Sequence, residues 1–223
     1  MKPKRIVDTR TALGGSRRLA AGRSVSVQIS GRNGIPSTAT AAVVNVTAVG
    51  PGAAGRLTVI PCTTGTPTTT TVQYAKGQVV ANTTIATLDA RGRFCVWTSA
   101  ASDVLVDVTG WLAPGTGARL TPVGPTRLAD TRSGLGGSRR LTGNRTMVLD
   151  VRSKAGAASA VALNVTVVGP AAPGYVTVYP CGTTRPATST INHVGGEVRA
   201  NNTIVGVGGG KVCIYSLVAA DVV

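Results

Sequence analysis

The stretch DTRTALGGSRRL at residues 8–19 returns as DTRSGLGGSRRL at residues 130–141, with ten of the twelve letters identical. The two copies lie 122 positions apart (130 − 8). The similarity continues outside this motif, in the pairs AVVNVTAVGP (42–51) with ALNVTVVGP (162–170) and GRLTVIPC (55–62) with GYVTVYPC (174–181). A repeat of this length has the size of a domain, so the chain is a tandem duplication of a unit of about 110 residues.

The segment between the two copies has the composition of a linker. APGTGARLTPVG (113–124) is rich in Gly and Pro, which interrupt regular structure. We therefore predict a first domain at residues 1–113, a linker at 114–124 and a second domain at 125–223.

Alternating apolar residues predict strands within each unit. In SVSVQIS (24–30), Val25, Val27 and Ile29 share one face, and polar residues occupy the other. Further candidates in the first unit are 42–49, 56–60, 69–74, 79–88, 93–97 and 103–111. Short strands at about ten-residue spacing are typical of two-sheet sandwiches. We therefore predict an all-β protein of two tandem β-sandwich (jelly-roll-like) domains.

The cysteines recur in the same places of the repeat. Cys62 and Cys95 match Cys181 and Cys213, so each domain has one pair, 33 or 32 residues apart (95 − 62 and 213 − 181). The spacing fits no zinc motif, because CxxC is absent and the chain has a single histidine. One internal disulfide per domain is the better interpretation, with buried reduced thiols as the alternative. Disulfides indicate a compartment outside the cytoplasm.

The charge is strongly positive. The chain has 23 Lys+Arg against 8 Asp+Glu, a formal net charge of +15. Such a surface attracts wall polymers with phosphate or carboxylate, anionic lipid or nucleic acid. No apolar run is long enough to predict a membrane span. No signal peptide precedes the first motif, so we expect a mature form, a cut-out domain, an incomplete reading frame or a protein that is not exported.

Several motifs follow the first one in a fixed order: LNVTVVGP (163–170), GYVTVYPCGTTRPATST (174–190), VCIYS (212–216) and, in the first unit, DVLVDVTGW (103–111). Their order over nearly the whole chain resembles a tandem repeat of secreted proteins from high-GC Gram-positive (actinobacterial) bacteria, often found beside wall hydrolases or peptidases. The resemblance implies an exported, non-catalytic β module, and it implies no particular ligand.

The acidic residues give no catalytic pattern. Asp8 and Asp130 recur, each between arginines, so we interpret them as structural joints with Arg10 and Arg132. No GxSxG, HExxH or Cys–His arrangement occurs. We therefore predict a protein that is not an enzyme, with no metal and no cofactor. Four recurring asparagines are also expected to be structural, bonding backbone groups within apolar strands: Asn45, Asn164, Asn82 and Asn201.

Two groups of side chains are candidates for ligand binding. Adjacent arginines after Gly-Gly-Ser suit a phosphate or carboxylate, and aromatic rings suit a sugar. The arginines are Arg17, Arg18, Arg139 and Arg140, and the aromatic residues are Trp111, Tyr175 and Tyr179. Trp97 and Tyr215 follow the cysteines by two positions, so they share the cysteines' face, which we expect to include the core. For the arginines, a solvated basic turn is the competing interpretation.

Three functions remain open. The favoured one is a secreted, non-catalytic module that attaches a protein to the cell envelope through anionic wall polymer or glycan. The second is a structural spacer or assembly subunit, and the third is a surface protein of a phage or particle. Nucleic acid is a weaker candidate partner, because the arginines are dispersed and lack interleaved aromatic residues.

The second domain lacks most of its last strand. DVLVDVTGWL (103–112) ends the first domain, whereas the second stops at Asp221-Val222-Val223. The sequence predicts either that a longer protein has been shortened here or that a partner chain pairs with the open edge.

Overall fold

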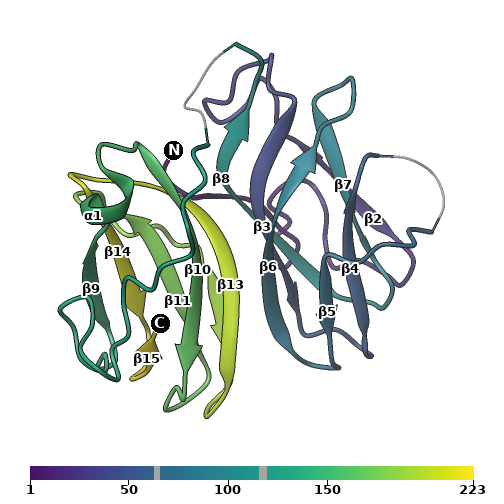
Figure 1. Ribbon diagram of the computed structural model, residues 1–223. Coiled ribbons are helices and arrows are strands. Elements are labelled where there is room, and N and C mark those ends of the chain that lie inside the picture. The colour runs from purple at the N-terminus through teal and green to yellow at the C-terminus, as the bar shows by residue number, and fades with distance from the viewer. Residues whose placement is uncertain (63–65, 116–119) are drawn as a thin grey trace. The chain divides into compact units, whose positions relative to one another are not determined.

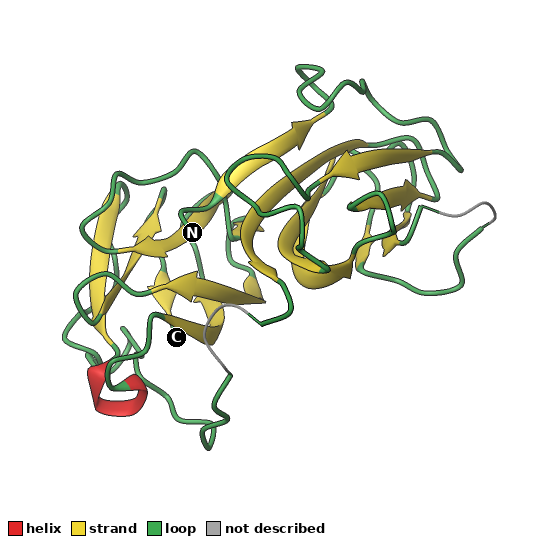
Figure 2. Ribbon diagram, turned by 90° about the horizontal axis from the view of Figure 1, so that it is seen from above, coloured by secondary structure: helices red, strands yellow, loops and turns green. Residues whose placement is uncertain are grey.

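The computed structural model describes residues 1–62, 66–115 and 120–223. The chain forms two compact units, Lys4–Gly117 and Ala118–Val223, the latter together with Met1–Pro3. We call them the first and second unit. They divide within the predicted linker 114–124, of which residues 116–119 lie outside the described residues. Strands account for almost all of the regular structure of both units (Figure 2).

The first unit is a sandwich of two antiparallel sheets, ordered β1-β8-β3-β6 and β2-β7-β4-β5 (Figure 1). Its strands are β1 (Lys4–Asp8), β2 (Ser24–Gln28), β3 (Ala41–Val49), β4 (Gly55–Ile60), β5 (Val72–Tyr74), β6 (Val79–Thr87), β7 (Arg93–Thr98) and β8 (Asp103–Leu112). The strands pair from the outside of the sequence inward, as β1·β8, β2·β7, β3·β6 and β4·β5. This pairing arises when one long antiparallel ribbon is rolled into two sheets. This is a jelly roll.

The predicted alternation produces the core of the first unit. In β2, Val25 and Val27 are buried whereas Ser24 and Ser26 are exposed. The inward faces of both sheets supply the same apolar cluster, which is rich in valine and contains Phe94. Burial of each such side chain stabilises the fold by about 1.5–3 kcal/mol.

The predicted strands of the first unit agree with the structure to within one or two residues, apart from β1 and β5. Strand β1 is absent from the predicted set because its sequence, KRIVD, is short and charged. Strand β5 begins at Val72 rather than at residue 69. The reason lies in a threonine: the backbone N–H of Val59 donates to the side chain of Thr71 (2.9 Å), so the backbone ladder stops there.

The second unit repeats this architecture with one strand fewer. Its elements are β9 (Arg145–Asp150), α1 (Arg152–Ala155), β10 (Ala160–Val168), β11 (Gly174–Pro180), β12 (Ile191–His193), β13 (Val198–Gly206), β14 (Lys211–Ser216) and β15 (Asp221–Val222). The sheets are ordered β13-β10-β15 and β12-β11-β14-β9, and they enclose a separate apolar core. Strand β15 has two residues where β8 has ten.

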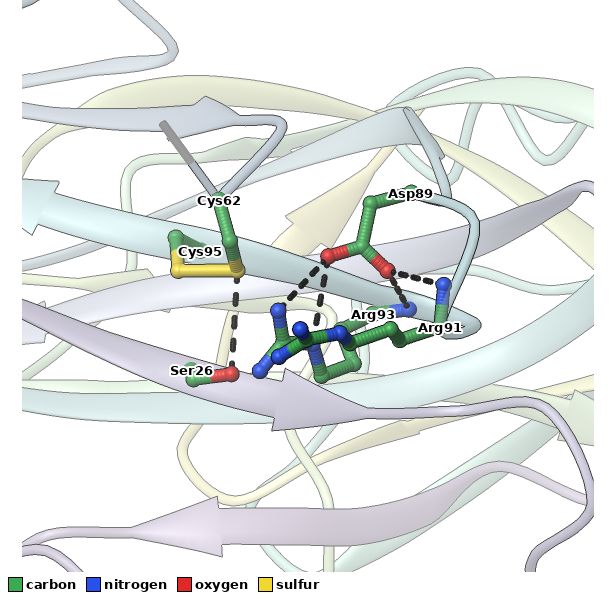
Figure 3. The surroundings of a disulfide bond; sticks show 6 residues. All are labelled: Ser26, Cys62, Asp89, Arg91, Arg93 and Cys95. Carbon is green, nitrogen blue, oxygen red and sulfur yellow. Dashed lines mark hydrogen bonds and ion pairs between the residues drawn. A yellow bond between two sulfur atoms is a disulfide. The ribbon is translucent and has the colours of Figure 1, made fainter. Parts of the chain in front are cut away.

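Both predicted disulfides are confirmed. Cys62–Cys95 joins the end of β4 to the neighbouring strand β7, and Cys181–Cys213 does the same for β11 and β14. The Cα atoms lie 4.9 and 5.0 Å apart. Figure 3 shows the first bond, with the Cys62 sulfur 3.6 Å from the Ser26 hydroxyl oxygen. The all-β sandwich prediction, with one disulfide in each unit, is therefore correct.

In the described residues, no helix has the length and apolar character needed to cross a membrane.

Candidate functional site

The repeated DTR…GGSRR motif ties the start of each unit to its end. Thr9 donates a hydrogen bond to Asp103 (2.7 Å) and accepts one from the backbone N–H of Val104 (2.9 Å). Corresponding contacts, at 2.7 and 3.0 Å, join Thr131 to Asp221 and Val222. The threonine thus holds the last strand of the sandwich against the first turn.

The aspartate of the motif forms the predicted structural contact with the arginine two residues after it. Arg10 donates to both carboxylate oxygens of Asp8, at 2.9 and 2.6 Å, and Arg132 donates to Asp130 at 2.8 and 2.7 Å. These hydrogen bonds lower the pKa of Asp8, and lower that of Asp130 to about 2. A carboxylate held in this way serves structure, because it stays ionised and its oxygens are occupied.

One arginine of each Arg-Arg pair also has a structural partner. Arg18 donates to Asp103 at 2.7 Å and to two backbone carbonyl oxygens, and Arg140 donates to Asp221 at 2.5 Å and to the carbonyl of Gly169 at 2.7 Å. These guanidinium groups are therefore part of the joint. All four arginines are exposed, but Arg17 and Arg139 form no ion pair within the described residues, and Arg139 only donates to the carbonyl of Arg132 (3.5 Å).

The first glycine of the Gly-Gly pair is required for steric reasons. Gly14 has a φ of +86°, and a Cβ atom there would lie 2.9 Å from Cγ2 of Val7. Gly136 has a φ of +83°, and its Cβ would lie 2.9 Å from the carbonyl oxygen of Leu128. Only glycine fits at both places. Most of the repeated motif is thus explained by folding.

The first unit has a buried ion pair beside this joint. Arg5 binds Asp107 through two parallel hydrogen bonds, of 2.8 and 3.0 Å, between strands β1 and β8. Asp107 is 1% exposed, and burial raises its pKa despite the opposing effect of Arg5. In the second unit the equivalent Arg127 binds Asp130 at 2.9 Å and is more than half exposed.

Every acidic residue of the chain has an arginine partner. The pairs are Asp8–Arg10, Asp89–Arg93, Asp103–Arg18, Asp107–Arg5, Asp130–Arg132, Asp150–Arg152, Asp221–Arg140 and Glu197–Arg199. Figure 3 shows one of them, with both Asp89 oxygens bound by Arg93 and by the backbone N–H of Arg91. The carboxylates are therefore used internally.

An aromatic cluster lies on the outer face of sheet β12-β11-β14-β9. Tyr179 and Tyr215 are buried there with Cys213, in a cluster separate from the main core, and Tyr175 packs against them. The rings of Tyr175 and Tyr215 are 6.0 Å apart. Arg185 stacks 3.6 Å above Tyr215, so the ring of Tyr215 is covered by a cation. Tyr179 is also covered, at 7% exposed.

The first unit has a similar stack. Arg56 lies 5.4 Å from the ring centre of Trp97, which shares a face with Cys95. Trp97 and Tyr215 are both buried, as expected for this face, although each lies outside the larger apolar cluster of its unit. Trp111, a predicted sugar platform, instead packs against the core of the first unit.

Arg56 and Arg185 were missed by sequence reasoning. They occupy different positions of the repeat, since Arg56 lies in β4 and matches Tyr175, whereas Arg185 lies in a loop. The alternation of strand residues does not predict which arginine covers an aromatic ring. A cation stacked on an aromatic ring contributes about 0.5–2 kcal/mol of attraction. The only available signal was the aromatic residue two positions after each second cysteine.

Three of the four recurring asparagines have structural contacts. Asn82 and Asn201 donate to the backbone carbonyls of Thr71 and Thr190 (2.9 and 2.7 Å) in the segments that precede β5 and β12, and so connect the two sheets. Asn45 is buried and accepts from Thr83. Asn164, its equivalent, is exposed.

His193 gives the second unit a pH dependence. His193 is 4% exposed, and this burial lowers its pKa. The backbone hydrogen bond of Val194 and the charge of Glu197 raise the pKa of His193, but by less. Just below about pH 6.5, His193 is therefore protonated in the unfolded chain but still neutral in the folded one, so the unfolded chain binds more protons. We expect the second unit to lose stability as the pH falls from about 6.5 to the lowered pKa of the folded state, measured by urea unfolding at several pH values.

A matched variant comes from the first unit, where Tyr74 occupies the position of His193 and its hydroxyl contacts Thr98 (2.9 Å). His193→Tyr should remove the loss of stability that begins as the pH falls below about 6.5. The same slope in this variant would show that another group causes it. Because the chain has one histidine, its NMR titration gives the folded pKa directly.

No protein-family model matches the sequence of this chain, and no curated protein matches it. Two of the solved structures that have some likeness to it are the following. The PBSX exported protein XepA is 16% identical, with 99% of this chain and 86% of that chain covered and a TM-score of 0.30. The N-terminal CBM22-1–CBM22-2 tandem domain of Xyn10C from Paenibacillus barcinonensis is 14% identical, with 92% and 82% covered and a TM-score of 0.23. At these TM-scores, neither likeness assigns a function.

Proposed function

We propose that this chain is a non-catalytic binding module that attaches to an anionic polymer or glycan of the cell envelope. The observation that carries the proposal is the pairing of every carboxylate with an arginine inside a chain whose formal net charge is +15. Each carboxylate is thereby neutralised by its own arginine, and the remaining basic side chains have no acidic neighbour to neutralise them. A polyanion is the natural counterpart of such a surface.

The unopposed cations are distributed over both units. In the described part of the chain, these basic residues form no direct ion pair with a carboxylate: Lys2, Lys4, Arg17, Arg23, Arg32, Arg56, Lys76, Arg91, Arg139, Arg145, Lys154, Arg185 and Lys211. A dispersed charge suits a long repeating polymer better than a single small anion, because many weak contacts add along the polymer.

The carboxylates support a non-catalytic role. A general acid at neutral pH requires a raised pKa, whereas arginine partners lower the pKa of Asp8, and those of Asp130 and Asp150 to about 2. Asp107 has a raised pKa, but it is enclosed between β1 and β3 and bound by Arg5.

Two features support a location outside the cytoplasm. Both disulfides are compatible with an extracellular protein, since reduced thiols prevail in the cytosol. The resemblance of the motifs to secreted actinobacterial repeats agrees with this. For a glycan, the most suitable place is the outer face around Tyr175 and Arg185, which offers an aromatic edge beside a cation.

A structural spacer is the second candidate. It is favoured by the joint itself, because Asp8, Thr9, Arg10 and Arg18 all make contacts within the unit. Such a spacer would have the same fold and would bind no polymer. Direct binding measurements therefore separate the two functions.

The two arginines of the repeated motif that form no ion pair in the described part of the chain, Arg17 and Arg139, are the sharpest test of polymer binding. The probe is purified polyglycerol-phosphate wall polymer, and neutral β-glucan is the comparison. Arg17→Ser with Arg139→Ser should weaken binding to the polymer by about fivefold or more, because two guanidinium contacts to phosphate are lost. Binding should also fall steeply with salt, as screening shortens the range of the surface charge.

The control removes the same charge elsewhere. Lys76→Ser with Lys154→Ser takes one exposed lysine from each unit and should weaken binding by less than about twofold. Equal losses in both variants would mean that net charge alone matters. Absence of binding to the polymer at low salt would reject the proposed function and leave the spacer.

A further inference from the structure

A loop of the second unit carries an arginine across the outer face of sheet β12-β11-β14-β9. The loop, residues 181–190, connects β11 to β12. The disulfide of this unit holds its start, and the hydroxyl of Thr177 on β11 donates to the carbonyl of Thr188 (2.7 Å) near its end. The buried Pro186 fixes the backbone directly after Arg185. Arg185 therefore extends from a segment whose position is set by the sheet.

The guanidinium group of Arg185 is positioned by a ring but bound by no acceptor of the chain. It lies 3.6 Å above the ring centre of Tyr215, and the residue is exposed. Within the described residues it forms no ion pair and no hydrogen bond. A stacked guanidinium keeps its N–H groups at its rim, where they can donate two parallel hydrogen bonds to one carboxylate. Every carboxylate of the chain already has an arginine, so this acceptor has to come from another molecule.

Tyr175 is the accessible ring beside this cation. It is half-buried, and its ring centre lies 6.0 Å from that of Tyr215. Tyr179 and Tyr215 are buried, and the hydroxyl of Tyr215 donates to the side-chain oxygen of Asn144 (2.7 Å). In the part of the chain that the structure describes, the hydroxyl of Tyr175 has no such partner. A ring with an accessible edge and a free hydroxyl suits the apolar face and the hydroxyl groups of a sugar.

The first unit shows that the fold does not require this pair. At the positions of Tyr175 and Arg185 it has Arg56 and Thr66 (175 − 119 and 185 − 119). Arg56 lies 5.4 Å from the ring centre of the tryptophan on β7 and donates to the carbonyl of Pro67 (2.9 Å), so the first unit itself binds this guanidinium. The loop is anchored to β4 by the same kind of threonine contact, at 2.8 Å. An accessible ring beside an unbound cation is thus a feature of the second unit that folding leaves unexplained.

We propose that Tyr175 and Arg185 form a binding site for a sugar residue that carries a carboxylate, a hexuronic acid of a glycan. The sugar ring packs against Tyr175, and its carboxylate accepts two hydrogen bonds from Arg185. A phosphate would use the cation alone, whereas one hexuronic acid residue uses both groups. This inference rests on the proposed function, which it narrows to one class of sugar and to one unit.

The test measures binding of the full chain to penta-galacturonic acid by isothermal titration calorimetry. The comparison ligand is the same oligosaccharide with its carboxyl groups reduced to alcohols. The acidic form should bind about tenfold more tightly or more, because hydrogen bonds between two charged groups are the strong ones. Arg185→Gln should remove most of this preference. Lys154→Gln removes an exposed cation from the same unit and should change either affinity by less than about twofold.

The ring is tested by Tyr175→Arg, which introduces the residue of the first unit at this position. The variant gains a positive charge, so binding driven by charge alone would become stronger. The proposed site predicts the opposite: affinity for penta-galacturonic acid should fall by about threefold or more, because the sugar ring loses its aromatic contact. The NMR signal of His193 reports whether the second unit of each variant is folded.

The outcomes separate this site from the proposed function. Equal affinities for the acidic and the reduced oligosaccharide would overturn the site, even if polyglycerol-phosphate polymer binds the chain. Equal losses in Arg185→Gln and Lys154→Gln, or tighter binding by Tyr175→Arg, would overturn it as well. If neither polyglycerol-phosphate polymer nor penta-galacturonic acid bound, the proposed function would be rejected together with the site.

Discussion

Replacing Arg5 with alanine is expected to lower the free energy of unfolding of the first unit by about 3–5 kcal/mol near pH 7. The loss arises from Asp107, which would remain almost fully buried without its cation. Trp97 and Trp111 are the two tryptophans of the chain and both lie in the first unit, so tryptophan fluorescence during urea unfolding reports this unit selectively.

The repeat supplies a matched control. Arg127→Ala removes the equivalent arginine, whose partner Asp130 is also held by Arg132, and should lower stability by less than about 1 kcal/mol. Arg5→Lys keeps the charge but loses one of two parallel hydrogen bonds, so its loss should be intermediate. Similar losses for Arg5→Ala and Arg127→Ala would show that Asp107 is hydrated in solution.

The effect of Arg5→Ala should depend on pH in a defined direction. Burial raises the pKa of Asp107, and removing Arg5 raises it further. A group whose pKa is raised in the folded state favours folding at low pH, and this contribution is lost as the pH rises through that pKa. The difference between Arg5→Ala and the unaltered chain should therefore shrink as the pH is lowered.

The duplication made much of the fold predictable from sequence. Strand periodicity identified β2 and β3, because Val25, Val27 and Val44 follow a two-residue period set by the pleat. The matched positions of Cys62 and Cys181 pointed to one disulfide per unit. Comparison of the two copies also predicted the shortened strand at Asp221, which no single unit could have revealed.

The side-chain partners could not be predicted in the same way. Periodicity gives the face on which a residue lies, but a partner depends on strand order and register, which only the folded sheet defines. Arg18 and Asp103 are 85 residues apart, and Arg5 and Asp107 are 102 apart. The sequence suggested that both arginines of Arg17-Arg18 are available for a ligand, whereas the joint occupies one of them. Arg185 over Tyr215 depends in the same way on how a loop crosses the sheet.

Removing either disulfide should have an effect of similar size on its own unit. The loops closed by Cys62–Cys95 and Cys181–Cys213 differ by one residue, 33 against 32, so the chain-entropy account gives a loss of roughly 3–4 kcal/mol for each. The test uses two double variants. One combines Cys62→Ala and Cys95→Ala, and the other combines Cys181→Ala and Cys213→Ala. Tryptophan fluorescence follows the first unit, and the His193 NMR signal follows the second.

The consequences of these equal losses should nevertheless differ between the units. The second unit has a two-residue β15 and half-buried Val161 and Leu163, so it begins with less buried apolar surface to offset the loss. We expect the variant without Cys181–Cys213 to unfold at a much lower urea concentration, with the tryptophan transition unchanged. If removal of one disulfide shifted both transitions, the two units would not fold independently. If the first unit were instead the weaker one, the shortness of β15 would have little effect on stability.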